Sequence, residues 1–141
     1  KEGLVAPPPT PSYTPDAPVL QQVREALRNG IGPAEAVDMA VSLPESPERA
    51  DAAFLLLEYA AEAGNAEAAA RVARYYDPSD TGPSGTIRKN PETAWDWYHS
   101  ALSGGIEKVQ PDMDELRRWG RKRAEEGSTE ARTLLERWER R

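Results

Sequence analysis

The chain has 141 residues, with 18 Lys and Arg against 24 Asp and Glu, so its formal charge is −6. This length suits one domain and is short for two, and the acidic balance argues against general binding to nucleic acid or anionic membranes. The absence of cysteine excludes a disulfide framework, thiolate zinc sites and a cysteine nucleophile. No apolar run approaches the roughly 18 residues that a membrane-spanning helix needs.

Residues 1–17 are rich in proline and include the run Pro7-Pro8-Pro9. Because proline fixes φ and removes an amide donor, we expect this segment to be extended and partly polyproline II. We interpret it as a tether that joins a helical domain, residues 18–141, to an upstream membrane anchor or another domain. The first residue is Lys1 rather than Met, which is typical of a processed chain or a piece of a longer one. The alternative is a ligand for an SH3-like or WW-like groove.

Two short helices are predicted next, over about 18–29 and 33–43. Asp16 is the candidate N-cap of the first, and Gly30 suits the left-handed end of that helix. Apolar residues recur at helical spacing in both. They are Val19, Leu20, Val23, Ala26 and Leu27 in the first helix and Ala36, Val37, Ala40 and Val41 in the second. The short connection between them predicts an antiparallel pair.

A third helix should start at Ser46-Pro47-Glu48, with Ser46 as its N-cap, and should end at Gly64. It is apolar nearly all round, so we expect it to be the most buried element. Asn65 is the predicted N-cap of a fourth helix, from Ala66 to about Tyr76. A polar loop follows, from Asp77 to about Lys89.

Asn90 is the predicted N-cap of a fifth helix, which ends near Gly105. The whole span 64–105 resembles one Sel1-like repeat, a tetratricopeptide-related helical hairpin. The matching residues are Ala68, Val72-Ala73 and Tyr76 in the first helix, then Ile87, Asn90, Ala94, Trp97-Tyr98, Ala101-Leu102 and Gly105. The resemblance implies an all-α, right-handed solenoid of antiparallel helix pairs, with about seven helices in this chain.

The flanking segments match the repeat less completely. Residues 53–64 resemble a preceding second helix, at the same offset of 105 − 64 = 41 residues that separates Gly64 from Gly105. Downstream, Trp119, Ala124 and Gly127 resemble another second helix. However, 127 − 105 is 22, which is too short for a full repeat, so we expect the solenoid to be interrupted at residues 106–111.

The repeat pattern also sorts the aromatic residues into two groups. The repeat positions predict four buried rings: Tyr76, Trp97, Tyr98 and Trp119. Four rings lie off the repeat positions and are expected to be freer: Tyr13, Tyr75, Trp95 and Trp138. Among these, Tyr75 is the best candidate for an exposed contact.

The sequence carries no pattern that is typical of an enzyme, a metal site or a cofactor site. His99 is the sole histidine and has no nucleophile or orienting group placed with it. The loop Asp77–Gly82 has two carboxylates but lacks the alternating acids of a calcium loop, so we expect Asp and Ser to cap local turns there. Phosphate-binding, dinucleotide-binding and nucleophile-elbow motifs are absent.

The resemblance therefore implies a non-catalytic scaffold that binds another protein or a peptide. In related folds the first helix of each hairpin lines the concave face, so the predicted partner surface is the non-packing side of the fourth helix. Its residues are Glu67, Arg71, Arg74 and Tyr75. Arg and Tyr are enriched at the centres of interfaces.

Two other functions stay open at this stage. Sel1-like proteins of bacteria often act at the cell envelope, so the resemblance also implies a glycan- or peptidoglycan-associated module and favours the envelope over the cytoplasm. A nucleic-acid contact could use the basic helix 115–124, where Trp119 stands among arginines. Acids at 112–115 and 125–126 flank that helix, however, and they favour ion pairs along a solvated helix face.

Overall fold

The computed structural model describes residues 17–140, and this part of the chain is entirely helical apart from its turns and loops. The helices are α1 (Pro18–Arg28), α2 (Pro33–Val41), α3 (Arg49–Glu62), α4 (Ala66–Tyr76), α5 (Pro91–Ser103), α6 (Gln110–Glu125) and α7 (Thr129–Glu139), with a 3-10 turn η1 (Glu107–Val109). The prediction of an all-α chain with about seven helices is confirmed. The predicted tether lies outside the described residues except for Ala17, and so does the candidate cap Asp16.

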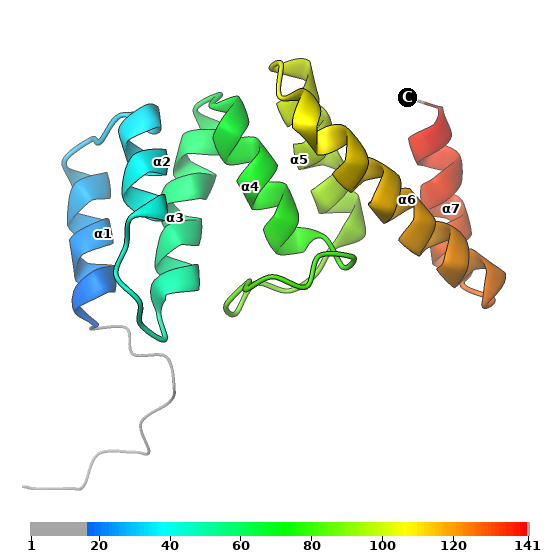
Figure 1. The fold of residues 1–141 in the computed structure, drawn as a ribbon, viewed down its shortest axis with the longest axis horizontal. Helices are drawn as coiled ribbons and strands as arrows, with labels where there is room; N and C mark the ends of the chain where they lie inside the picture. The colour runs from blue at the N-terminus through cyan, green and yellow to red at the C-terminus, as the bar shows by residue number, and fades with distance from the viewer. Residues whose placement is uncertain (1–16, 141) are drawn as a thin grey trace, which may run out of the picture.

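The helices follow one another in a row, and successive helices run in alternating directions (Figure 1). Each of α2, α3 and α4 packs on the helix after it, α6 packs on α7, and α1 rests on α3. In this view α4 and α6 lie on the viewer's side, with α5 behind them. None of the described helices is long and apolar enough to cross a membrane.

Two helix ends that are 41 residues apart in the sequence have the same geometry. Gly64 has φ +99° and Gly105 has φ +97°. The N–H of the next residue, Asn65 or Ile106, donates back to the carbonyl of Ala60 or Ala101 at 3.0 Å in both cases. Glycine adopts this left-handed conformation without steric cost, which ends each helix and sets the direction of the next segment.

The predicted N-caps are confirmed for α4 and α5 and wrong for α3. Asn65 accepts from the Ala68 N–H at 2.9 Å, and Asn90 accepts from the Thr93 N–H at 3.1 Å. Helix α3 begins only at Arg49, because the Arg49 N–H bonds the Ser46 carbonyl and closes a turn first. The Ser46 hydroxyl is buried and has no hydrogen-bond partner.

Small residues let the central helices approach closely. Helix α4 buries Ala68, Ala69, Ala70, Val72 and Ala73. Helix α3 buries more residues than any other described helix, as its sequence predicted. Such a core depends on short distances between helix axes rather than on large side chains.

The prediction for the tryptophans is wrong. Trp95 and Trp138 are each 1% exposed, and their rings stack with centroids 4.8 Å apart. Trp97 and Trp119 are only half-buried. On α5 the buried face is Ala94, Trp95, Tyr98 and Ala101. Trp97 lies at the edge of this face, where it packs against the core but stays partly exposed. The return of α7 then covers Trp95 with Trp138.

The region after α5 also differs from the repeat pattern. The segment between Gly105 and Gly127 holds η1 and one long helix, α6, which pairs with α7. The segment 106–111, where an interruption is predicted, holds the short turn η1 and the first two residues of α6.

Candidate functional site

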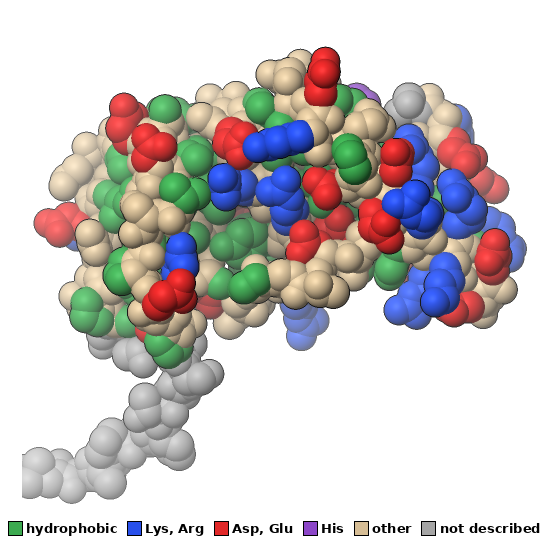
Figure 2. Space-filling model, in the orientation of Figure 1, with side chains coloured by type: hydrophobic (Ala, Val, Ile, Leu, Met, Phe, Trp, Pro, Cys, Tyr) green, Lys and Arg blue, Asp and Glu red, His purple; other side chains and the backbone are tan. Residues whose placement is uncertain are grey.

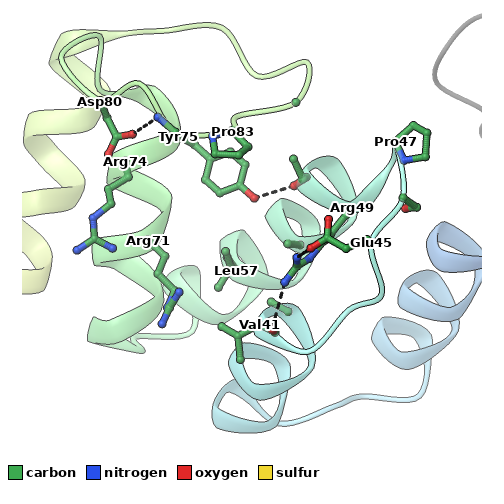
Figure 3. Close-up of a pocket in the computed structure, with 16 residues that line it drawn as sticks. Val41, Glu45, Pro47, Arg49, Leu57, Arg71, Arg74, Tyr75, Asp80 and Pro83 are labelled. Carbon is green, nitrogen blue, oxygen red and sulfur yellow. Dashed lines mark hydrogen bonds and ion pairs between the residues drawn. The ribbon is translucent and has the colours of Figure 1, made fainter.

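A groove runs between α4 on one side and α2 and α3 on the other (Figure 3). We call it the α2–α4 groove, and its volume is about 800 Å³. Segment 42–48 extends the α2 and α3 wall, and loop 77–90 closes one end of the groove. Three residues of the predicted partner surface line it, namely Arg71, Arg74 and Tyr75.

The fourth predicted residue, Glu67, lies beside the groove and holds two cations. Its carboxylate is 3.2 Å from Arg71 Nε and 3.4 Å from Lys108 Nζ. Glu67, Arg71 and Arg74 follow one another at helical spacing, so they form one row along α4. The structure thus brings the predicted charged residues together, with Glu67 as the partner of Arg71.

Both arginines of α4 line the groove. Figure 3 shows the Arg74 side chain on the side of α4 that faces away from α3 and Val41. Arg71 is 38% exposed, and its Nε is buried without a hydrogen bond, because the contact with Glu67 is close but poorly aligned. Arg74 is 33% exposed and lies 3.5 Å from an Asp112 oxygen. An arginine carries five N–H donors, so each of these side chains can bind a further acceptor.

Tyr75 is half-buried rather than freely exposed as expected, and it forms part of the wall of the groove. Its hydroxyl donates to the Ala50 carbonyl at 2.7 Å, and its ring lies 5.0 Å from the ring of Phe54. Burial, and then the nearby Asp51 carboxylate, raise the pKa of Tyr75 to about 12. Tyr75 therefore fixes α4 against α3.

The facing wall presents an apolar side chain that the sequence placed in the core. Val41, at the end of α2, is 45% exposed and lines the groove. It is the exposed large hydrophobic residue of the described part of the chain. Next to it, Arg49 pairs with Glu45 and donates to the Val41 carbonyl at 3.3 Å. This arginine is therefore occupied in holding segment 42–48.

Loop 77–90 is held in place at several points. The Asn90 N–H donates to the Tyr76 carbonyl at 2.7 Å, which joins the two ends of the loop. The Thr86 N–H donates to Asp51 of α3 at 2.8 Å. Within the loop Asp80 accepts from the Gly82 N–H at 2.7 Å, so the predicted turn-capping role of the loop acids is confirmed.

A buried carboxylate anchors the start of this loop. Asp77 is 2% exposed and accepts from the Tyr98 hydroxyl at 2.7 Å and from the Ser79 N–H at 2.8 Å. Burial, followed by the hydrogen bond to Asp77, raises the pKa of Tyr98 well above its usual range. Both groups have partners, so the pair joins the loop to α5. Within the described residues, no group of three or more His, Cys, Asp or Glu side chains is placed to hold a metal ion.

Charged side chains of both signs are spread over this side of the molecule, and a dense group lies at the α6 end (Figure 2). Over the middle, cations and acids alternate beside apolar side chains. At the α6 end, Arg117 pairs with Asp114 at 2.9 Å and Arg118 with Glu115 at 2.6 Å. These pairs three residues apart are the ion pairs along a helix face that the sequence favoured.

A second hollow of about 650 Å³ lies between the start of α5, the second half of α6 and helix α7. Trp119 and Arg123 line it, and the Arg123 guanidinium lies 5.5 Å from the centre of the Trp119 ring. The ring is thus partly covered by a cation from its own helix.

Comparison with known proteins finds no match for this chain, whether among family models, curated proteins or solved structures. The interpretation of the groove therefore depends on the chain's own residues and on their geometry.

Proposed function

We propose that this chain is a non-catalytic interaction module that binds a peptide segment of another protein in the α2–α4 groove. The observation that carries the proposal is that Arg71 and Arg74 from α4 and Val41 from α2 meet around one open space. Arginine donors beside apolar surface are the composition that interface centres favour. The groove is open to solvent and is lined from α2, α3, α4 and loop 77–90, so a segment of chain can enter it.

We further propose that the helices form a Sel1-like, right-handed solenoid and that the groove belongs to its concave face. Support comes from the central pair α4 and α5, where small residues pack. Solenoid proteins use extended concave surfaces for binding.

The glycan alternative has less support in this structure. A carbohydrate platform needs exposed rings, but Trp95 and Trp138 are packed on each other. Tyr75 is hydrogen-bonded to α3, and Trp119 is half-covered by Arg123. The nucleic-acid alternative is weakened by the acid partners of Arg117 and Arg118.

The proposal can be tested by selecting peptides from a random twelve-residue display library on the purified chain. The variant R71E/R74E reverses both groove charges and leaves Tyr75 intact, so the wall of the groove is kept. The control R118E/R121E makes the same change of charge on exposed α6 residues outside the groove. Circular dichroism and thermal unfolding check that all three proteins are folded.

We expect the original chain and the α6 control to enrich common peptide sequences that R71E/R74E does not bind. Equal binding of the enriched peptides by all three proteins would place the binding surface elsewhere. Failure of the original chain to enrich any sequence would contradict the proposed function.

A further inference from the structure

We infer that the ligand of the α2–α4 groove is an extended peptide in which acidic and apolar residues alternate. The inference rests on the proposed function and adds the chemistry of the partner. It follows from the different character of the two walls. The α4 wall carries Arg71 and Arg74, and the α2 wall carries Val41.

The α4 wall is ready to bind carboxylates. Arg71 has a buried Nε without a hydrogen bond, and its contact with Glu67 is badly aligned, so it loses little by turning to a ligand. A carboxylate accepts two parallel N–H bonds from one guanidinium, which neutral acceptors do not match. An acidic side chain is therefore the best complement to Arg71.

Arg74 can exchange its present partner for a ligand. Its contact with Asp112 is 3.5 Å long, and both side chains are about one-third exposed. Ion pairs that are open to solvent in this way contribute little to stability. A carboxylate of the ligand would thus compete with Asp112 for Arg74. Contact between an apolar side chain of the ligand and Val41 would add to the affinity of the ligand.

The facing wall has the opposite preference. Val41 is exposed there, and the neighbouring cation Arg49 is occupied by Glu45 and by the Val41 carbonyl. Successive side chains of an extended peptide point to opposite sides. A peptide lying between the walls can therefore direct acidic side chains to the arginines and a neighbouring apolar side chain to Val41, and alternating acidic and apolar residues provide this arrangement.

The net charge of the chain opposes the expected preference for an acidic peptide. At −6 the molecule as a whole attracts basic peptides and repels acidic ones. A preference for an acidic peptide must therefore come from the local arrangement of Arg71 and Arg74.

The test uses three labelled eight-residue peptides and fluorescence anisotropy at physiological salt. The first repeats Glu-Val four times, the second repeats Lys-Val four times, and the third has four Glu followed by four Val. We expect the alternating acidic peptide to bind at least about tenfold more tightly than the other two. The third peptide has the same composition as the first, so it tests the alternation itself.

Variants then locate the binding. R71Q/R74Q should weaken binding of the alternating acidic peptide by about tenfold or more, and V41S should weaken it by a smaller factor. The control R118Q/R121Q removes the same charge outside the groove and should leave the affinity unchanged.

Equal affinity for the lysine peptide or the block peptide would overturn the inference, as would full binding by R71Q/R74Q. If peptides enriched from the library bind the groove but are basic or neutral, the inference fails while the proposed function stands. If no peptide of either kind binds, both fail.

Discussion

The pairs α4–α5 and α6–α7 are both antiparallel hairpins, yet they close in opposite ways. In the first pair small groups meet, and a Cβ at Gly104 would lie 2.6 Å from the Ala66 Cβ. In the second pair a small residue makes room for large ones, since Gly120 lies beneath Leu135 and Trp138. An antiparallel hairpin can therefore be built from two packing arrangements. The repeat pattern describes only the contact between small residues that joins α4 and α5.

The pairs also differ in how they are anchored. A buried hydrogen bond between Tyr98 and Asp77 fixes the first pair at its loop. The second pair is anchored through α7, where Trp138 stacks on Trp95 and Arg137 pairs with Glu92 at the start of α5. The first pair therefore depends on an internal polar contact and the second on a neighbouring aromatic ring.

The largest predicted effect is on the second pair. Trp138→Ala removes a fully buried ring and should lower the free energy of unfolding by about 3–5 kcal/mol. Urea unfolding followed by circular dichroism measures the change. Trp119→Ala is the matched control, because this ring is half-buried and should cost clearly less. A larger loss of unfolding free energy for Trp119→Ala than for Trp138→Ala would contradict this prediction and would agree with the burial expected from the repeat positions.

The next effect concerns the first pair. Tyr98→Phe leaves the buried Asp77 oxygen without its donor and should destabilise the chain by about 1–3 kcal/mol. Tyr76→Phe serves as the comparison, since the Tyr76 hydroxyl makes no hydrogen bond to the described residues. Equal melting temperatures for the two variants would mean that the Asp77 contact contributes nothing to stability.

A smaller effect should be shared by the two pairs. Ser128 caps α7 by accepting from the Ala131 N–H at 3.1 Å, much as Asn65 caps α4. Replacing either cap by Ala should cost about 0.5–2 kcal/mol. Denaturant titration of S128A beside N65A makes the measurement, and a difference above that range would show that one hairpin depends on its cap far more than the other.

The smallest effect lies at the contact between the pairs, where Asp112 of α6 meets Arg74 of α4. Burial, which outweighs the attraction of Arg74, raises the pKa of Asp112 above its usual 3.8. The fold therefore favours the neutral carboxyl of Asp112. The contribution of this group to the free energy of unfolding is fully present below pH 3.8 and is lost as the pH rises through the folded-state pKa.

We accordingly expect Asp112→Asn to change stability at pH 7 by less than about 1 kcal/mol, and in the stabilising direction. The gain should shrink as the pH falls towards 3.8, which thermal unfolding across a pH series measures. A clear destabilisation at pH 7 would mean that the pair with Arg74 outweighs the burial of Asp112.

Local rules explain the features that the sequence predicted well. The caps Asn65 and Asn90 and the left-handed glycine Gly30 depend on residues within one turn, so neighbouring sequence is sufficient. The small-residue face of α4 follows from helical spacing alone. For the same reason the row of Glu67, Arg71 and Arg74 could be placed beside one groove.

The errors concern contacts between distant segments. Tyr75 is fixed by Phe54 and Ala50, 21 and 25 residues away, so helical spacing on α4 cannot distinguish it from an exposed residue. Trp95 is buried because α7 packs Trp138 against it. The interval after Gly105 is too short for a full repeat, so the repeat pattern could not predict this contact. Val41 fits the apolar stripe of α2, but no described residue covers it, so it faces the groove instead.

The bond from Thr86 to Asp51 has a consequence for the thermodynamics of binding. It fastens loop 77–90 to α3, while the contact between Asn90 and Tyr76 joins the ends of the loop. The groove is thus preorganised, and a ligand has to restrict its own conformations but not those of the loop. Asp51→Asn weakens the acceptor without removing the side chain, so any loss of affinity should appear as a less favourable binding entropy in calorimetry.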